Sequence, residues 1–379
     1  MSNIDHIILF SFLFWLFFQI TEKQQSNLQK DYWKSLLPLI VFYILIVGLR
    51  YGWGNDWWGY RSFYSIPALE NIDEEKGFAI INLLLQSAGA NYTIATVVYT
   101  AIFLLSSLFL IRGYCNNKYM IALFLPATLL FNTAMIRQAM AFAFMFIALR
   151  FLNEKKYKYA LLFGFIMLNI HGSTIMFAGI VVCFYFLQII YEKPLPIYIT
   201  IPLYLICVLF DRSVGLYIGN NLSDFMSSIE VADHFKGYTE YADSWFGVDA
   251  LNEEYKQSSL ALILNTLSDI SLFCIGYFVL SKHPNDKITY LYNTATIGAI
   301  VFRAGLQMEL VHRIGQSLQL FYFVPLGYAF YLLYSTRNDL SVQKQHICKV
   351  GTVCYLTFTI LFYGRFILLN PSAHFVWNY

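Results

Sequence analysis

Residues 135–173 read MIRQAMAFAFMFIALRFLNEKKYKYALLFGFIMLNIHGS. Two apolar runs are joined by a hydrophilic connection, with Arg137 at the start of the first run and His171 at the end of the second. A helix rises about 1.5 Å per residue, so each run is long enough to cross most of a bilayer. We therefore expect a membrane hairpin that returns Arg137 and His171 to one face and leaves the lysines of the connection on the other. An arginine and a histidine at one membrane surface are a candidate site for chemistry on an anionic substrate.

The composition of the whole chain agrees with this hairpin. Of its 379 residues, 58% are apolar and only 13% are charged, which is typical of a polytopic membrane protein. We predict an all-α integral membrane protein that forms a single membrane domain over residues 1–379. The six cysteines show no metal-ligand or redox spacing, so neither a metal nor a disulfide is predicted. The apolar run 7–20 has no cleavage site after it and predicts a retained helix rather than a cleaved signal.

Apolar runs along the chain predict about twelve transmembrane helices. They fall at 5–21, 35–50, 93–111, 119–133, 134–150, 158–172, 174–190, 196–211, 258–281, 288–305, 314–334 and 347–366. The shorter stretch 78–90 is expected to lie at the interface or to dip in as a half-helix. Segment 211–257 is predicted to be one long extracytoplasmic (periplasmic) loop inserted in the membrane domain. Its aromatic rings and carboxylates suit the binding of sugars, and a packed extracellular cap explains them equally well.

The basic residues predict the orientation. Twelve of the 15 lysines fall in one set of alternate loops, which we place in the cytoplasm, so both termini lie outside. Arginines behave differently, because seven of the ten fall on the outer face against this tendency. These are Arg50, Arg61, Arg137, Arg212, Arg303, Arg313 and Arg365. Snorkelling at helix ends explains any one of them, but guanidinium groups also bind phosphate and carboxylate in a bidentate manner, which explains the set better.

Residues 48–64, GLRYGWGNDWWGYRSFY, follow the second predicted span directly and lie on that outer face. Arg50, Asp56 and Arg61 fall within twelve residues. They form either an ion pair that steadies a glycine-rich loop or a polar cluster that faces a substrate. In the predicted span 134–150, Arg137 shares a helical face with small alanines. This arrangement favours an arginine side chain that points into the helix bundle. Gln138 stands beside it as an assisting polar group.

Two further elements supply candidate residues. His171 is either a structural histidine or a general base or substrate-orienting group. The Gly-Ser that follows it is not a serine-hydrolase signal, because no nucleophile elbow accompanies it. Residues 303–313 are placed between two spans on the outer face and contribute arginines at both ends and His312. Asp269, in the middle of a span, needs a partner that the sequence does not identify.

In this order the stretches resemble the EpsG family of polysaccharide polymerases, which is related in role to the Wzy-type repeat-unit polymerases. The resemblance covers most of the chain. It rests on GLRY at 48–51, GNDW at 54–57 with Tyr60, EKGF at 75–78, IRQAMA at 136–141, NIHGS at 169–173, Arg313 and Asn370-Pro371 in the tail. The chain departs from the family pattern at Asn55 and Trp57, where the pattern has Thr and Tyr, and at Lys76, where it has Pro.

The resemblance implies a membrane glycosyltransferase. It would polymerise undecaprenyl-pyrophosphate-linked oligosaccharide repeat units into O-antigen, capsule or exopolysaccharide, at the periplasmic face of a bacterial inner membrane. The reaction would be inverting and would use no metal or other cofactor. Its partners would be the lipid-linked donor and acceptor, membrane lipid and a chain-length regulator, with no nucleic acid.

The residues take roles in this reaction that agree with their chemistry. Arginines stabilise the charge that develops on a pyrophosphate leaving group, and an acceptor hydroxyl needs a base. Arg137 is expected at the reacting centre, with His171 or Asp56 as the base. The remaining residues are expected to bind substrate, with Arg50 and Arg313 at the pyrophosphate. They are Arg50, Tyr51, Arg61, Gln138, Arg303, His312 and Arg313.

Three other functions remain open at this stage. A transporter or flippase of lipid-linked oligosaccharide would also use intramembrane arginines, but it should carry polar groups through the whole membrane depth. An O-antigen ligase would share the donor chemistry and differ in its acceptor. A membrane-bound O-acyltransferase fits less well, because its polar groups should line a channel from the cytoplasmic to the outer side.

Overall fold

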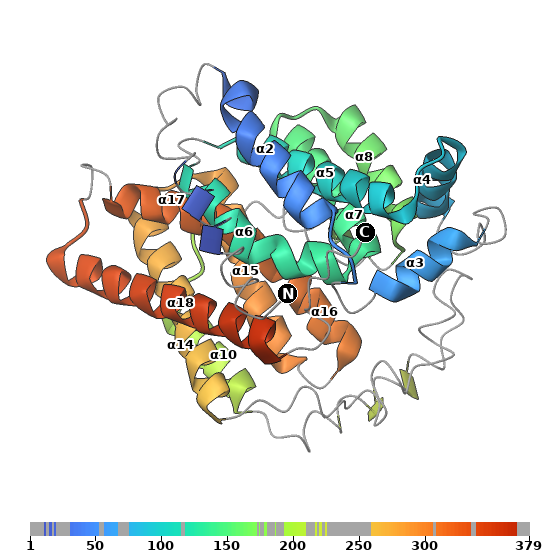
Figure 1. The fold of residues 1–379 in the computed structure, drawn as a ribbon. Helices are drawn as coiled ribbons and strands as arrows, with labels where there is room; N and C mark the ends of the chain where they lie inside the picture. The colour runs from blue at the N-terminus through green and yellow to red at the C-terminus, as the bar shows by residue number, and fades with distance from the viewer. Residues whose placement is uncertain are drawn as a thin grey trace. The chain divides into compact units, whose positions relative to one another are not determined.

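The computed structural model describes residues 31–52, 57–66, 76–114, 118–172, 193–209, 259–305, 308–334 and 339–369, together with isolated positions elsewhere. Within these ranges every regular element is a helix (Figure 1), which confirms the prediction of an all-α fold. The predicted loop 211–257 and the predicted spans 5–21 and 174–190 lie largely outside the described residues. The single membrane domain and the periplasmic loop therefore stay predictions.

Several helices are long and apolar enough to cross a membrane, by length and composition. Within the described ranges there are four such stretches: α5 (Tyr92–Ile111), α7 (Ile136–Asn153), α14 (Ser259–Lys282) and Val311–Tyr334, which runs through α16 (Glu309–Gln319), η6 (Leu320–Tyr322) and α17 (Phe323–Tyr334). Three apolar helices are shorter: α2 (Tyr32–Gly48), α8 (Tyr157–Ile170) and α10 (Ile197–Val208). These helices support an integral membrane protein, whereas the number of twelve spans stays a prediction.

The remaining described helices are α3 (Trp57–Ser65), α4 (Lys76–Ser87), α6 (Lys118–Ala134), α15 (Asp286–Ala304) and α18 (Val342–Leu369). Of these, α3 was not predicted, because the glycines of 48–64 suggested a loop. Among the described glycines of this stretch, Gly52 has the positive φ that favours glycine, at 67°, whereas Gly59 lies inside α3. The helix forms because Trp57 and Tyr64, two turns apart, both face the protein interior.

The second half of segment 303–313 also differs from the prediction of a connection between spans, whereas Arg303 lies in a helix, as the predicted span 288–305 requires. Arg303 lies in the last turn of α15, and His312 and Arg313 lie in the first turns of α16. Only the short connection 305–308 separates the two helices. The prediction placed the second helix too late because Glu309, His312 and Arg313 make its first turns polar.

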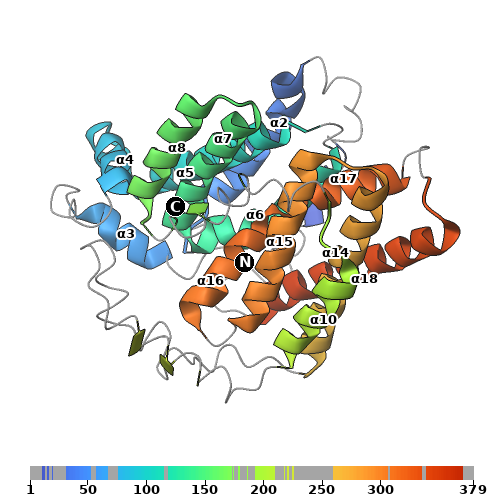
Figure 2. The ribbon, with the colours of Figure 1, turned by 180° about the vertical axis from the view of Figure 1, so that it is seen from behind.

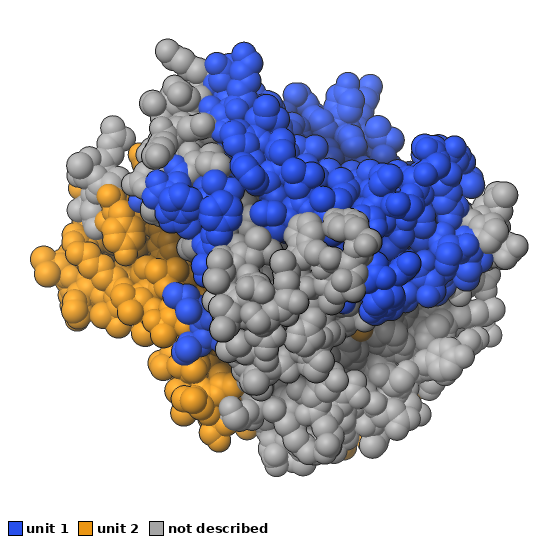
Figure 3. All heavy atoms as spheres, viewed as in Figure 1, with its two compact units in different colours: residues 1–178, 360–379 blue, residues 179–359 orange. Residues whose placement is uncertain are grey.

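The chain divides into two compact units (Figure 3). Unit 1 comprises Met1–Ala178 and Ile360–Tyr379, and unit 2 comprises Gly179–Thr359. The second boundary therefore falls inside α18. Each unit has its own set of packed helices, and these are described in turn.

In unit 1, α2 packs on α5, α5 on α7, α7 on α8 and α8 on α4 (Figures 1 and 2). The interior is aromatic, with the ring of Phe103 at 5.9 Å from that of Phe124 and 6.0 Å from that of Phe146. At the end of α2, Gly48 lies so close to α5 that an added Cβ would be 2.8 Å from the Cα of Val97. Thr96 Oγ1 donates a hydrogen bond of 2.7 Å to the carbonyl of Gly48. The C-terminus of α2 is thereby fixed against the N-terminus of α5.

In unit 2, α15 packs on α16, α10 lies against α14 and α15, and α17 lies against α14 and α15. Glycines allow the backbones of α15 and α16 to approach closely. A Cβ on Gly298 would lie 2.6 Å from the Cβ of Leu318, and a Cβ on Gly315 would lie 2.3 Å from the backbone nitrogen of Phe302. Small residues at helix contacts are the usual way in which helices of membrane proteins pack tightly.

We expect Gly315→Ala to destabilise the protein by about 1–3 kcal/mol, because the added methyl group meets backbone that has no free space to move into. The measurement is the midpoint of thermal unfolding in detergent. Gly164→Ala in α8 is the matched control, since no atom lies within 4 Å of an added Cβ there. An equal midpoint for both variants would contradict the close α15–α16 contact.

Candidate active site

The predicted hairpin is present as α7 and α8. The two helices pack antiparallel, since the ring of Phe151 lies 5.2 Å from that of Tyr159, whereas the ring of Phe144, two turns earlier in α7, lies 6.3 Å from that of Phe163, later in α8. Because α7 begins at Ile136 and α8 ends at Ile170, Arg137 and His171 belong to the same end of the hairpin. The connection, with its lysines, lies at the opposite end.

Arg137 lies in the first turn of α7 and contacts α3. Its Nε donates a hydrogen bond of 3.3 Å to the hydroxyl of Tyr60. Its guanidinium carbon lies 5.4 Å from the centre of the Tyr60 ring. Ala141, one turn further on, is fully buried, and Ala148 on the same side of α7 is half-buried. The half-buried Arg137 is thus oriented by the aromatic residue Tyr60, and Gln138 beside it is buried.

His171 caps the C-terminus of α8 in an extended conformation. Its backbone N–H donates a hydrogen bond of 3.2 Å to the carbonyl of Met167. Its backbone carbonyl accepts a hydrogen bond of 3.1 Å from the backbone N–H of Thr174. Helix α4 covers this end of α8, because a Cβ on Gly77 would lie only 2.8 Å from the carbonyl of Asn169. These backbone contacts fix the position from which the imidazole of His171 extends.

Tyr60 and Phe78 connect the part of the site around Arg137 with the part around His171. Their ring centres are 6.3 Å apart, and Phe78 is the second residue after the start of α4, next to the glycine that touches the end of α8. The helices α3 and α4 therefore connect the arginine end of α7 with the histidine end of α8. Sequence reasoning gave Tyr60 no role beyond the family pattern, although its place four residues before Tyr64 on one helical face was a signal.

Arg50 follows the end of α2 and is 1% exposed. Its Nη1 donates to the carbonyl of Val47 over 2.9 Å and to Thr100 Oγ1 over 3.2 Å. Its Nε is buried and has no hydrogen-bond partner in the described part of the chain. A buried cation normally has an anionic partner. The hydrogen bonds of Arg50 instead go to neutral oxygen atoms, so this guanidinium retains the capacity to bind an anion.

Arg61 extends from α3 into a cluster of three aromatic rings. The guanidinium carbon lies 5.4 Å from the ring centre of Tyr51 and 5.5 Å from those of Trp57 and Trp58. One N–H donates to the hydroxyl of Tyr51 over 2.9 Å. The rings orient the cation without neutralising it.

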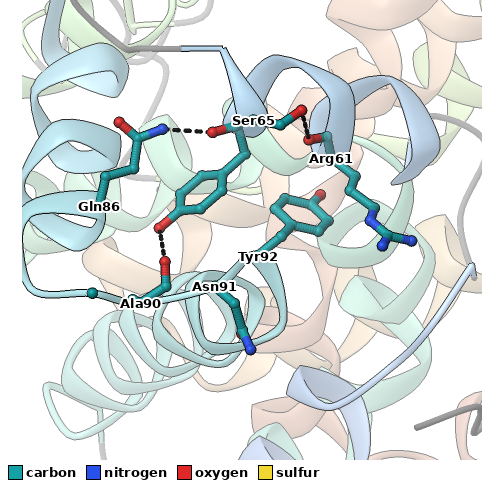
Figure 4. Close-up of a pocket in the computed structure, with 8 residues that line it drawn as sticks. Arg61, Ser65, Gln86, Ala90, Asn91 and Tyr92 are labelled. Carbon is teal, nitrogen blue, oxygen red and sulfur yellow. Dashed lines mark hydrogen bonds between the residues drawn. The ribbon is translucent and has the colours of Figure 1, made fainter.

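Arg61 also lines a groove of about 690 Å³ formed by α3, the end of α4 and the start of α5. Figure 4 shows Arg61 and Gln86 on opposite sides of this groove, with Tyr92 between them. Gln86 Nε2 donates to the carbonyl of Tyr64 over 2.5 Å, and the hydroxyl of Tyr64 donates to the carbonyl of Ala90 over 2.8 Å. Burial raises the pKa of Tyr64, so its hydroxyl remains protonated as this hydrogen bond requires.

Unit 2 holds the other predicted residues. The hydroxyl of Tyr204 donates to Asp269 Oδ2 over 2.5 Å and accepts from Arg303 Nε over 2.8 Å. Arg303 Nε also lies 3.8 Å from Asp269 Oδ2. The partners of Asp269 that the sequence did not identify are therefore Tyr204 and Arg303, from α10 and α15.

His312 and Arg313 extend from the first turns of α16. The ring of His312 packs against that of Phe302, with 4.2 Å between the centres, and it is 9% exposed. Arg313 is half-buried. Arg303 thus forms an ion pair with Asp269, and His312 packs against an aromatic ring. The roles of both residues in substrate binding stay predictions.

Asp56 lies outside the described residues, so the alternative base to His171 has no described geometry. The described residues contain no group of three or more His, Cys, Asp or Glu side chains arranged to hold a metal ion. The roles of the ten candidate residues in catalysis and substrate binding stay predictions.

Comparison with known proteins identifies a family. The model of the EpsG family matches residues 33–379 of the chain. No curated protein and no solved structure matches it.

Proposed function

We propose a function on the premise that this chain belongs to the EpsG family, the family of Wzy-type polysaccharide polymerases. The protein is a membrane glycosyltransferase that joins lipid-linked oligosaccharide repeat units into a surface polysaccharide. The observation that carries this proposal is the end of unit 1, where the buried Arg50, the half-buried Arg137 and His171 are provided by α2, α7 and α8. This combination suits a negatively charged leaving group and a hydroxyl nucleophile.

The family and the charge pattern also suggest the substrates, the membrane and the face at which the protein acts. The donor is a growing chain on undecaprenyl pyrophosphate, and the acceptor is a single lipid-linked unit. The protein crosses a bacterial inner membrane about twelve times, and the site faces the periplasm. Both substrates reach the site from the outer leaflet between helices. Inversion at the anomeric carbon and independence of metal are part of the same proposal.

In the proposed reaction, the acceptor hydroxyl oxygen attacks the anomeric carbon of the donor sugar. The new glycosidic C–O bond forms as the bond from that carbon to the pyrophosphate oxygen breaks, and the pyrophosphate leaves with the electron pair. Arg50 and Arg137 stabilise the negative charge that develops on it through charge-assisted hydrogen bonds. The proton of the acceptor hydroxyl goes to His171 or to Asp56.

A transporter or flippase of lipid-linked oligosaccharide is the second candidate, and one observation favours it. Asp269 and Arg303 form a largely buried ion pair between helices, and intramembrane charges are common in transporters. Tyr204 completes this pair with a hydrogen bond, so the charges are already satisfied within the protein. This arrangement suits a structural role, and we therefore favour the enzyme. A ligase that transfers the same donor to another acceptor is the third alternative.

The test uses purified protein in vesicles that contain undecaprenyl-pyrophosphate oligosaccharide, followed by separation of products by length. A ladder of repeat lengths is the expected result. The absence of a ladder, together with movement of labelled lipid between the leaflets, would reject the polymerase and support the transporter. Transfer of one chain to a different acceptor, without a ladder, would support the ligase.

Tyr60→Phe should reduce the rate of ladder formation by roughly three- to tenfold, because the loss of one hydrogen bond to Arg137 removes about 0.5–1.5 kcal/mol of orientation energy. Ser62→Ala, also on α3, is the control, since the hydroxyl of Ser62 donates only to the carbonyl of Trp58. A rate for Tyr60→Phe equal to that of the wild type would show that Arg137 does not depend on this contact.

A further inference from the structure

We infer that the groove between α3, α4 and α5 binds an acidic sugar of the repeat unit, one that carries a carboxylate. This inference rests on the proposed function and deepens it, since it assigns a chemical class to part of the substrate. Its observations are the charge, the shape and the polar groups of the groove.

The charge of the groove favours an anion. Among the described residues that line it, Arg61 is the only charged one. Within the described residues, its contacts are with the hydroxyl of Tyr51 and with the three aromatic rings of Tyr51, Trp57 and Trp58. A guanidinium has five N–H donors, so Arg61 has donors left for a bidentate contact with a carboxylate.

The start of α5 adds to this charge. Asn91 precedes the helix, and its side chain accepts a hydrogen bond of 2.9 Å from the N–H of Ile94. Tyr92 is the first residue of this 20-residue helix. The N-terminal end of a helix carries a partial positive charge. Arg61 of α3 and the N-terminus of α5 therefore both make the groove positive.

The other groups suit a sugar ring better than a small inorganic anion. The groove has a volume of about 690 Å³, within the range of roughly 300–1,000 Å³ that small-molecule sites occupy. Tyr64 and Tyr92 supply apolar ring surface, and Gln86 and Asn91 supply amide groups for hydroxyls. The Nε2 of Gln86 donates to the carbonyl of Tyr64, which leaves its carbonyl oxygen as an acceptor for a sugar hydroxyl.

The groove lies beside the proposed reacting centre on the same helix. Arg61 directly follows Tyr60, whose hydroxyl accepts from Arg137. A repeat unit that placed its reacting end at Arg137 would have a neighbouring sugar within reach of α3. An acidic sugar near the reacting sugar is therefore the part of the substrate that Arg61 would select.

The test measures binding of free sugars, without any polymerisation. Trp58 is 53% exposed, and its ring lies 5.5 Å from the Arg61 guanidinium, so its fluorescence should report a ligand at Arg61. The probes are a disaccharide that ends in glucuronic acid, the same disaccharide ending in glucose, and inorganic phosphate. Trp58→Phe identifies the signal that belongs to this site.

We expect saturable binding of the glucuronic acid disaccharide, and binding at least about tenfold weaker for the glucose disaccharide and for phosphate. Arg61→Met should remove the preference for the acid, and Arg61→Lys should restore part of it. Gln86→Ala should weaken both disaccharides together. The thermal unfolding midpoint of each variant shows whether it is folded.

Three results would overturn the inference: equal binding of the two disaccharides, binding of phosphate in preference to both, or no saturable signal from the folded wild type. None of them would affect the ladder assay. A ladder together with any of these results would leave the polymerase standing and reject the acidic sugar, whereas acidic-sugar binding without a ladder would reject the polymerase alone.

Discussion

Arg137→Ala is expected to lower the rate of polymerisation by about 10²–10³-fold, the effect of removing a group that stabilises charge in a transition state. The physical reason is the position of Arg137 in the first turn of α7, half-buried and held by Tyr60. In such an environment a guanidinium contact with pyrophosphate is stronger than in water. The measurement is the initial rate of ladder growth at saturating substrate.

Two variants control this result. Arg137→Lys keeps the charge but loses the planar fork, and it should recover only part of the rate. Lys158→Ala removes an exposed charge near the start of α8, at the opposite end of the hairpin from His171, and should leave the rate unchanged. Lys155 is a poorer control because its φ is 60°, so a substitution there also changes the turn. Equal rates for Arg137→Ala and Lys158→Ala would remove Arg137 from the reacting centre.

Asp269→Ala is expected to destabilise the protein by about 3–5 kcal/mol, since it leaves the buried guanidinium of Arg303 without its carboxylate. Arg303 is 4% exposed, so water cannot easily replace the lost partner. The measurement is the thermal unfolding midpoint in detergent.

The double variant Asp269→Leu with Arg303→Met separates the charge from the packing. It should recover most of the lost stability, because a buried ion pair is often replaced by apolar side chains at little cost. Tyr204→Phe should cost less, about 1–3 kcal/mol, since it removes a hydroxyl that joins the two charges. If Asp269→Ala unfolded at the same temperature as the wild type, the ion pair between Asp269 and Arg303 would be contradicted.

The sequence was sufficient to predict the hairpin of α7 and α8, because its apolar runs and hydrophilic connection depend only on local pattern. The same holds for α5, predicted at 93–111 and found at Tyr92–Ile111. Local pattern failed at α3, where glycines and tryptophans suggested a loop. Its helix is stabilised by tertiary contacts, such as that of the Trp57 ring with Tyr92 at 5.2 Å.

The partners of the charged residues could not be predicted from the sequence, because they too depend on tertiary contacts. Asp269 is 65 positions from Tyr204 along the chain, and Arg50 is 50 positions from Thr100. No local spacing encodes such contacts, because they arise only when helices pack. The sequence grouped Arg50 with Asp56 and Arg61 by proximity in the chain, whereas the structure buries Arg50 against α5 and exposes Arg61 to the groove.

The most direct test of the central claim is the stoichiometry of the reaction in vesicles that contain the wild-type protein. Donor and acceptor units are given different labels in lipid and sugar, and both released lipid pyrophosphate and chain length are counted. The proposed reaction predicts one lipid pyrophosphate released for each repeat added, with the sugar of the donor joined to the lipid of the acceptor. Lipid-linked units that cross the membrane with their linkage intact, and with no release of lipid pyrophosphate, would contradict it.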